Sequence, residues 1–339
     1  MKKYLLPKEG AFYKANLHTH TTVSDGKFTP EEIKKVYSEQ GYSIVAFTDH
    51  EVMVPHTELT DENFLAITGV EVGVTENGNY DFLFKKCYHL NLYSKKPYRT
   101  SFSTFNEKDV VLEHSRSYVT EEQKKYCYER TYSIECVNEM IKMANDEECF
   151  VSLNHPVWSL QNYVDYISLN GLWAVEWYNN GVSRWGLYET FQPIDDLLRI
   201  GKHVYPIATD DTHIPEDRFG GFVMVKSPVL KYEEVYEALK KGDFYSSENP
   251  LIEELSIENG IIHIKTSEVK RIIISAYDRC GFPVNAKEGK YLTDEYIDLN
   301  WFLRHAKEKQ DNNSYIRITI IDEFGRRAYT RAYLLSELS

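Results

Sequence analysis

Short apolar runs recur along the first two thirds of the chain, and stretches of helical pattern separate several of them. The clearest unit opens a helix with Thr29 as N-cap, Pro30 at the first helical position and Glu32 placed to close a capping box. Gly41 ends this helix, and the apolar run 44–47 follows directly, as in parallel strands that are covered on both faces. Repetition of strand, helix and strand predicts an α/β fold, and the length of 339 residues admits one barrel plus a small domain.

The same alternation gives the remaining elements and a division of the chain. Further strands are expected at residues 64–67, 88–93, 149–153, 172–177 and 204–208, and helices at 121–145 and 183–200. Residues 94–120 interrupt the alternation, either as a lid over the site or as a solvated excursion. After Gly242 short strands are expected at residues 255–258, 261–265, 271–276, 296–302, 315–322 and 328–334. We therefore predict a barrel over residues 1–250, with an insertion and helical region at 94–147, and a small all-β, sandwich-like domain over 251–339.

Composition argues against several classes of protein. The formal net charge of −13 disfavours nucleic acid as the main partner, because affinity for a phosphate backbone comes mostly from Lys and Arg. The five cysteines are odd in number and form no C-x-x-C pair, so neither a disulfide framework nor a thiolate zinc site is expected. No apolar run suits a membrane span, and the N-terminus lacks the apolar core of a signal peptide. We therefore expect a cytoplasmic protein.

Each apolar run stops at residues that can bind a metal or border a metal site. These stops are His18-Thr19-His20 followed by Asp25, Thr48-Asp49-His50, Glu71, His89, Asn154-His155-Pro156, Glu176 to Asn179, and Asp211-Thr212-His213. In α/β barrels the active residues gather at the carboxyl ends of the strands, so these side chains are expected to converge. Side chains two apart on a strand point the same way, so His18 with His20, and Asp211 with His213, can bind one ion. Imidazole and carboxylate ligands without thiolate suit Zn, Mn or Fe.

These motifs, in this order and spacing, resemble the PHP (polymerase and histidinol phosphatase) superfamily over roughly residues 1–250. The closer likeness is to the branch that includes the CehA/McbA-type metal-dependent hydrolases and the predicted two-domain phosphoesterases. In that branch a barrel is followed by a β-rich tail. Residues 242–250 look like the junction of that branch, although Asn249 stands where a glycine is commoner.

The resemblance implies a distorted (β/α)7 barrel with a trinuclear metal site, and thus two or three divalent transition metals (Zn, Mn or Fe) as cofactors. One metal would be held by His18, His20, Glu71 and Asp211, and Glu71 would bridge to a second held also by His89 and His155. The third would be held by Asp25, His50 and His213. Asp49 precedes a ligand and is expected to orient it, so that Glu71, Asp211 and Asp49 form the expected catalytic set. The D-x-H spacing favours Asp211 over Asp210 as the ligand.

The charge of such a cluster indicates the reaction. Three divalent ions with three carboxylates and one hydroxide would stay positive, which favours a phosphate and its displacement. We therefore expect a phosphoesterase in which a metal-bridging hydroxide attacks a small anionic, phosphorylated substrate. The alternatives are amide or carbamate hydrolysis at the same site, and a binding protein stabilised by its metals. Weaker candidates for the mouth or lining of the site are Lys27, His56, Cys87, His114, Asn179 and Arg218.

Overall fold

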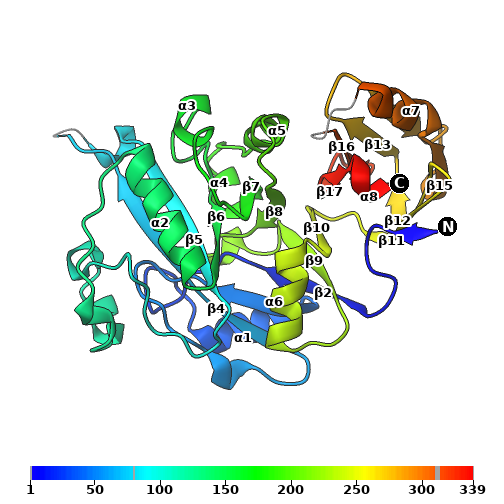
Figure 1. The fold of residues 1–339 in the computed structure, drawn as a ribbon. Coiled ribbons are helices and arrows are strands. Elements are labelled where there is room, and N and C mark those ends of the chain that lie inside the picture. The colour runs from blue at the N-terminus through cyan, green and yellow to red at the C-terminus, as the bar shows by residue number, and fades with distance from the viewer. Residues whose placement is uncertain (1, 79–80, 310–313, 339) are drawn as a thin grey trace.

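The protein is described here by a computed structural model that covers residues 2–78, 81–309 and 314–338 (Figure 1). The larger part of the molecule, at the left of Figure 1, holds most of the helices, and the smaller part holds both chain termini. The strands of the larger part are β2 (Ala11–Asn16), β3 (Tyr42–Phe47), β4 (Leu65–Thr75), β5 (Cys87–Ser94), β6 (Cys149–Leu153), β7 (Ala174–Asn179), β8 (Tyr205–Thr209), β9 (Phe222–Ser227) and β10 (Phe244–Ser247). Its α-helices are α1 (Pro30–Ser38), α2 (Ile134–Asp146), α3 (Tyr163–Tyr166), α4 (Asn180–Ser183), α5 (Gln192–Arg199) and α6 (Tyr232–Lys241). Its 3-10 turns are η1 (Thr57–Leu59), η2 (Phe82–Phe84), η3 (Glu107–Asp109), η4 (His114–Tyr118), η5 (Gln123–Lys125) and η6 (Pro215–Asp217).

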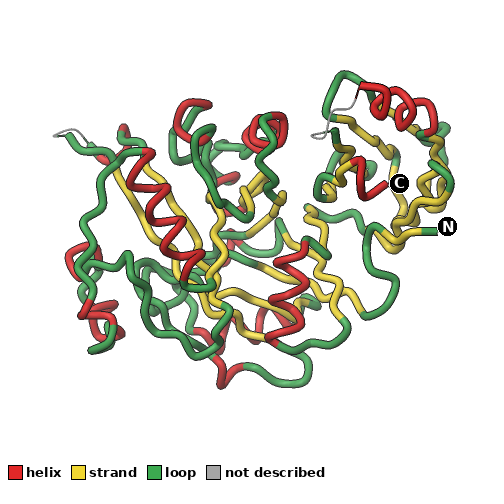
Figure 2. The backbone as a smooth tube through the Cα atoms, viewed as in Figure 1, coloured by secondary structure: helices red, strands yellow, loops and turns green. Residues whose placement is uncertain are grey.

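The strands of the larger part form one mixed sheet in the order β10-β9-β2-β3-β4-β5-β6-β7-β8. The neighbours β2-β3-β4 and β6-β7-β8 are parallel, whereas β5 runs antiparallel to both β4 and β6. Helix α2 packs against β6 and α6 against β9 (Figure 2). The α/β class is thus confirmed. Strand β8 lies beside β9 and β10, but no strand pairing joins them in the described part of the chain, so closure as a (β/α)7 barrel stays a prediction.

Helix α1 forms where its local signals predict it. The Thr29 side chain accepts a hydrogen bond from the Glu32 backbone N–H, and the Glu32 carboxylate accepts one from the Thr29 N–H, which completes the capping box. Ile33 and Tyr37 are buried on the inner face of the helix. Burial of an isoleucine side chain contributes about 1.5–3 kcal/mol, so packing adds to what the cap supplies. Gly41 then turns the chain into β3 with a left-handed backbone (φ 75°).

Two predicted helices are shorter than expected. In the region 121–145 the helix starts only at Ile134, because the Ser133 side chain caps it by accepting a hydrogen bond from the Cys136 N–H. In the region 183–200 the short helix α4 ends at Ser183, the left-handed Gly186 (φ 76°) follows, and α5 starts at Gln192 with Pro193 in its first turn. Proline lacks the N–H that a continuous helix needs at that position. The strand predicted at 172–177 starts two residues later, at Ala174.

The smaller part of the molecule is built from two antiparallel sheets. Its strands are β1 (Lys3–Tyr4), β11 (Ile252–Glu258), β12 (Ile261–Val269), β13 (Arg271–Ala276), β14 (Gly281–Asn285), β15 (Leu292–Asp298), β16 (Tyr315–Ile321), β17 (Arg327–Thr330) and β18 (Tyr333–Leu334), and its helices are α7 (Asn300–Lys309) and α8 (Leu335–Leu338). One sheet has the order β1-β11-β12-β15, and the other has the order β14-β13-β16-β17 and continues through β10 into the large sheet. Isoleucines such as Ile264, Ile272 and Ile318 belong to one buried apolar cluster drawn from both sheets.

One expectation for this part is wrong. The strand predicted at 296–302 ends at Asp298, and α7 takes the following residues, because the Asp298 carboxylate accepts a hydrogen bond from the Asn300 N–H and turns the chain. The part is therefore mainly, but not entirely, β. The domain boundary between residues 250 and 251 stays a prediction. Every helix in the described ranges is too short or too polar to span a bilayer.

Candidate metal centre

The structure brings the nine predicted ligand residues together at one end of the large sheet. They come from the loop after β2, the ends of β3, β6 and β8, and the strands β4 and β5; they are His18, His20, Asp25, His50, Glu71, His89, His155, Asp211 and His213. Within the described residues they form overlapping groups whose candidate ligand atoms lie within 4.8 Å of one another in each group. The carboxyl ends of β2, β3, β6 and β8 therefore converge here as the alternating pattern predicted, whereas Glu71 lies within β4 and His89 near the start of the antiparallel strand β5.

The first group is fully buried and has the spacing of metal ligands. His18 Nε2 lies 3.1 Å from His20 Nε2, and each of these atoms lies 3.2 Å from Asp211 Oδ1. Ligands about 2.1 Å from a tetrahedral ion are separated by about 3.4 Å, so these spacings fit one cation. Asp211 Oδ1 is also buried without a hydrogen-bond partner among the described residues. Such an atom is costly to bury unless a cation or donor meets it, and the donor set suits a transition metal.

Glu71 joins this group to the next. Its Oε2 lies 3.2 Å from His20 Nε2, while its Oε1 lies 3.2 Å from His89 Nδ1 and 3.3 Å from His155 Nε2. Oε1 also lies 3.3 Å from His18 Nε2, and Oε2 lies 3.2 Å from His50 Nδ1, so the carboxylate contacts imidazoles of all three groups. A carboxylate in this central position can bridge two ions.

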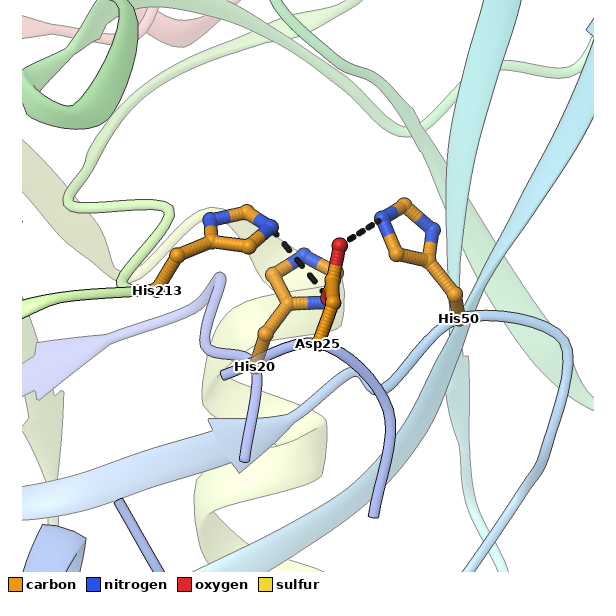
Figure 3. Close-up of side chains that lie close together, drawn as sticks. All are labelled: His20, Asp25, His50 and His213. Carbon is orange, nitrogen blue, oxygen red and sulfur yellow. Dashed lines mark ion pairs between the residues drawn. The ribbon is translucent and has the colours of Figure 1, made fainter. Parts of the chain in front are cut away.

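The third group surrounds Asp25. Its carboxylate lies between the rings of His213 and His50, at 3.4 Å from His213 Nε2 and 3.6 Å from His50 Nε2 (Figure 3). His20 Nδ1 lies 3.6 Å from the same carboxylate, so the two nitrogens of His20 face different groups. The resemblance assigned His20 to the first metal alone, and the structure places its ring between two groups.

The Glu176 carboxylate contacts two histidines of the cluster, His18 and His155, and fixes their positions. This buried carboxylate faces His18 Nδ1 at 2.8 Å and accepts hydrogen bonds from the His155 backbone N–H at 2.8 Å, Thr209 Oγ1 at 2.7 Å and Asn179 Nδ2 at 2.9 Å. A carboxylate accepts only, so His18 carries a proton on Nδ1, and Nε2 is the atom that remains to bind a metal. Asn179 also donates to Asp211 Oδ2 at 3.1 Å, so this candidate contacts a residue of the cluster.

Asp49 and Asp210 position loops. Asp49 accepts hydrogen bonds from the Thr21 N–H at 2.7 Å, and from the Ser24 N–H and hydroxyl at 3.2 and 2.8 Å. It therefore fixes the loop that carries Asp25, and none of its hydrogen bonds in the described residues goes to the neighbouring His50. Asp210 accepts from the Tyr37 hydroxyl and from three successive backbone N–H groups, at residues 219–221, and faces away from the cluster.

The backbone is strained where the ligands leave their strands. His155 and Asp211 have positive φ values of 26° and 51°, and Glu51, next to His50, has 63°. Such conformations cost non-glycine residues roughly 1–3 kcal/mol each and persist only where the surrounding structure fixes them. Three of the seven non-glycine residues with positive φ in the described part of the chain thus lie at or beside proposed ligands, as is common at functional sites.

Neighbouring imidazoles of the cluster differ widely in pKa because of burial and of the charges around them. Burial lowers the pKa of His20, but the carboxylates of Asp211 and Glu71 outweigh it and raise the pKa to about 10. Burial and the neighbouring His20 lower the pKa of His50 to about 3. The imidazolium groups in turn hold the pKa of Glu71 and Asp211 well below the usual range, although burial opposes this. Without cations the cluster therefore holds protons, which metal ions would replace.

A cavity of about 390 Å³ opens onto this cluster. Besides the ligands, Trp158, Arg184 and Trp185 line it. Arg184 Nε donates to the Gly181 carbonyl at 3.2 Å and pairs with Asp217 Oδ1 at 2.9 Å, but its terminal nitrogens make no hydrogen bond to any described residue. Neither Arg184 nor Trp158 was expected from the sequence. Trp158 follows His155 by three residues and packs on its ring at 4.9 Å, whereas Arg184 has no local signal.

The remaining candidates lie outside the cluster. His56 packs on Phe47 (ring centroids 4.8 Å apart), Arg218 stacks over Phe28, and Lys27 is exposed. His114 Nε2 contacts the Ser24 carbonyl at 2.6 Å and so touches the Asp25 loop rather than the ligands. Cys87 is buried and does not line the cavity.

Comparisons with known proteins give one family and several distant structures. The PHP domain family model matches residues 16–154. A two-domain protein from Bacteroides vulgatus containing a predicted PHP-like metal-dependent phosphoesterase is 14% identical, with 98% of each chain covered and a TM-score of 0.44. An amidohydrolase from Chromobacterium violaceum, with bound sulfate and no metal, is 14% identical over 59% of this chain and 88% of that chain, with a TM-score of 0.37. A lesion-specific endonuclease from Pyrococcus furiosus is 15% identical over 68% of this chain and 56% of that chain, with a TM-score of 0.40.

At TM-scores below 0.5 these structural likenesses carry no argument about the function of this chain. No curated protein matches it significantly. The matched residues 16–154 contain six of the nine ligand candidates, from His18 to His89. The family resemblance expected from the motifs is therefore confirmed by this match of residues 16–154 to the PHP domain family.

Proposed function

We propose that this protein is a metal-dependent phosphoesterase. The observation that carries the proposal is the buried set of imidazole and carboxylate atoms at ligand spacing, with Asp211 Oδ1 left without a hydrogen-bond partner in the described residues. This donor set fits Zn, Mn or Fe. The PHP domain match is consistent with such a site.

The ligand assignment that we propose follows the three groups. His18, His20, Glu71 and Asp211 would hold one ion; Glu71, His89 and His155 a second; and Asp25, His50 and His213 a third. Bound divalent ions would supply an activated water and neutralise the charge of a phosphate. Glu176 keeps the proton of His18 on Nδ1, and Asp49 keeps the Asp25 loop in place.

Arg184 favours a phosphate over a carbonyl substrate. Its guanidinium lines the same cavity as the ligands, and its terminal nitrogens have no hydrogen-bond partner among the described residues. A guanidinium can donate two parallel hydrogen bonds to two oxygens of a negatively charged phosphate. An amide or a carbamate ester carries no negative charge that would attract it. We therefore place Arg184 as the residue that attracts and orients the substrate.

The test compares substrates on metal-loaded protein. Bis-p-nitrophenyl phosphate, p-nitrophenyl phosphate, p-nitrophenyl carbamate and a single-stranded oligonucleotide would be assayed with bound metal, after chelation, and after return of Mn, Zn or Fe. We expect hydrolysis of at least one phosphate ester, its loss on chelation and its return with metal. Faster hydrolysis of the carbamate than of the phosphate esters would assign the protein to the alternative reaction. Bound metal without turnover of any substrate would contradict the proposal.

A matched pair of variants checks the site. His155→Ala removes a proposed ligand, and we expect it to lose hydrolysis and part of the bound metal while the protein stays folded. His203→Ala removes an exposed imidazole that lines no described part of the cavity, and we expect it to behave like the unchanged protein. Full activity in His155→Ala would contradict the assignment.

A further inference from the structure

A cavity of about 330 Å³ lies beside the segment that joins the larger part of the molecule to the smaller part. It is lined from β2, β3 and β9, and by Asn249 and Leu251, which follow β10. Among the described residues it shares none with the cavity that opens onto the metal ligands. Its volume is near the lower end of the range for small-molecule sites, about 300–1,000 Å³. We call it the junction cavity.

Lys14 brings a positive charge to the wall of the junction cavity. Its side chain is only partly exposed, and its Nζ lies 4.0 Å from the ring centroid of Tyr42 and 4.5 Å from that of Phe222. It makes no hydrogen bond or ion pair with any residue that the structure describes. The two rings attract the charge, but they leave the three N–H donors without an oxygen acceptor. Burial lowers the pKa of Lys14, and only the more distant Asp210 opposes this.

A second lysine, Lys226, lies beside the junction cavity. In the antiparallel pair of β2 and β9 it is opposite Phe12, which lines the cavity, and its Nζ lies 4.4 Å from the centroid of that ring. This ammonium also lacks a hydrogen bond or ion pair within the described ranges. Burial lowers its pKa, and the charge of Glu9 opposes this. Two lysines without an ion pair thus lie on neighbouring strands of a chain whose formal net charge is −13.

The other polar side chains of the wall can donate hydrogen bonds. The Ser43 hydroxyl has no partner among the described residues. Asn249 Nδ2 makes one long contact, at 3.4 Å to Asp322 Oδ2, so its second N–H lacks an acceptor in the described chain. No acidic side chain belongs to the described wall, and the rest of it is largely apolar, with Phe12, Phe222, Met224 and Leu251.

Donors without acceptors around an apolar cavity favour an anion with an apolar body. A carboxylate would accept charge-assisted hydrogen bonds from the ammonium, which are stronger than those between neutral groups. A neutral apolar molecule would leave the donors unsatisfied, and a cation would be repelled by Lys14. One ammonium in the wall neutralises the single charge of a carboxylate but only half the charge of a phosphate dianion.

We propose that the junction cavity binds a small monocarboxylate with an apolar body. The carboxylate would lie on Lys14 and Ser43, and the apolar body would lie against Phe222 and Met224. Because the cavity is separate from the metal ligands, this site does not depend on the proposed phosphoesterase function.

The test measures binding to the metal-loaded protein by calorimetry, with hexanoate, acetate, hexan-1-ol, hexylammonium and inorganic phosphate as probes. We expect hexanoate to bind at least about tenfold more tightly than acetate, which lacks the apolar body, and than hexan-1-ol, which lacks the charge. Hexylammonium should not bind. Tighter binding of phosphate than of hexanoate at this site would overturn the assignment to a carboxylate.

Variants locate the binding. Lys14→Met removes the charge but keeps an apolar side chain, and it should weaken hexanoate binding about tenfold or more. If this variant fails to fold, Ser43→Ala and Asn249→Gly test the donors, and each should weaken hexanoate binding about two- to tenfold. Lys142→Met removes an equal charge from a side chain on α2 that is 73% exposed, and it should bind hexanoate as the unchanged protein does.

A carboxylate can also bind to metal ions, so the variants decide where hexanoate lies. Weaker hexanoate binding in Lys14→Met, with metal content unchanged, would support the proposal. Hexanoate affinity that is equal in Lys14→Met and the unchanged protein would place the ligand elsewhere and overturn it. Equal affinities for hexanoate and hexan-1-ol, or no binding of hexanoate at millimolar concentration, would overturn it as well.

Discussion

Replacement of Glu176 by glutamine would test how the candidate metal centre is held. The carboxylate serves four donors: Oε1 faces His18 Nδ1 and Thr209 Oγ1, and Oε2 faces the His155 N–H and Asn179 Nδ2. A glutamine side chain offers one oxygen, so its NH2 group would face two of these donors. A buried donor left without its acceptor costs about 1–3 kcal/mol.

Either orientation of the amide damages the site. If the NH2 group takes the place of Oε2, the His155 backbone N–H and Asn179 Nδ2 both lose their acceptor. If it faces His18, the ring must accept at Nδ1 and carry its proton on Nε2, the atom that lies 3.2 Å from Asp211 Oδ1. A protonated nitrogen cannot bind a metal. Loss of such an orienting group typically weakens metal binding about 10- to 100-fold, and we expect a loss in this range.

The assay is competition of Zn or Mn between the protein and a chelating fluorophore, with metal per chain measured by mass spectrometry. Glu234→Gln, a change at an exposed residue of α6, serves as the matched control and should bind metal as the unchanged protein does. Unfolding temperatures without metal separate a folding defect from a ligand defect. Metal affinity in Glu176→Gln equal to that of the unchanged protein would refute the role given to this carboxylate.

Three further predictions address the substrate, a helix and the pH dependence of stability. Arg184→Met should lower kcat/KM for phosphate esters about tenfold or more, mainly through KM, and leave metal content unchanged; equal KM values would contradict its role. Thr29→Ala should lower the free energy of unfolding by about 1 kcal/mol in urea denaturation, because it removes the cap of α1; no loss would show that the cap is redundant. Burial raises the pKa of Glu189 to about 8 from 4.5, although the backbone N–H groups of Val157 and Trp158 oppose this. The folded chain then keeps a proton that the unfolded chain releases, so stability falls as pH rises between these two values. In Glu189→Gln this fall should be absent, and the stability of the variant relative to the unchanged protein should rise by a few kcal/mol from about pH 5 to pH 8. A relative stability that is constant with pH would contradict this pKa.

Local signals explain what could be predicted from the sequence. Thr29, Pro30 and Glu32 act within one helical turn, and the structure has the cap that they predict. The polar stops after the apolar runs were expected to converge, and they do, because the parallel strands β2, β3, β6 and β8 end at the same edge, where the antiparallel strand β5, which carries His89, begins.

What could not be predicted depends on residues far apart in the chain. Glu176 meets His18 across 158 positions, and Arg130 meets Glu51 across 79, and no spacing in the sequence reveals such pairs. Asp49 was expected to orient its neighbour His50 but holds the loop before Asp25 instead, since its partners are set by the packing of two loops. Helix α7 takes the second half of the strand predicted at 296–302, because a single turn at Asp298 outweighed the apolar pattern after it.

Anomalous X-ray scattering from crystals grown with Mn, Zn or Fe would test the central claim most directly. If this claim is right, we expect two or three peaks, one of them about 2.0–2.3 Å from His18 Nε2, His20 Nε2 and Asp211 Oδ1, and another beside Glu71, His89 and His155. Strong peaks elsewhere with none at these atoms, or no peak at saturating metal, would contradict it.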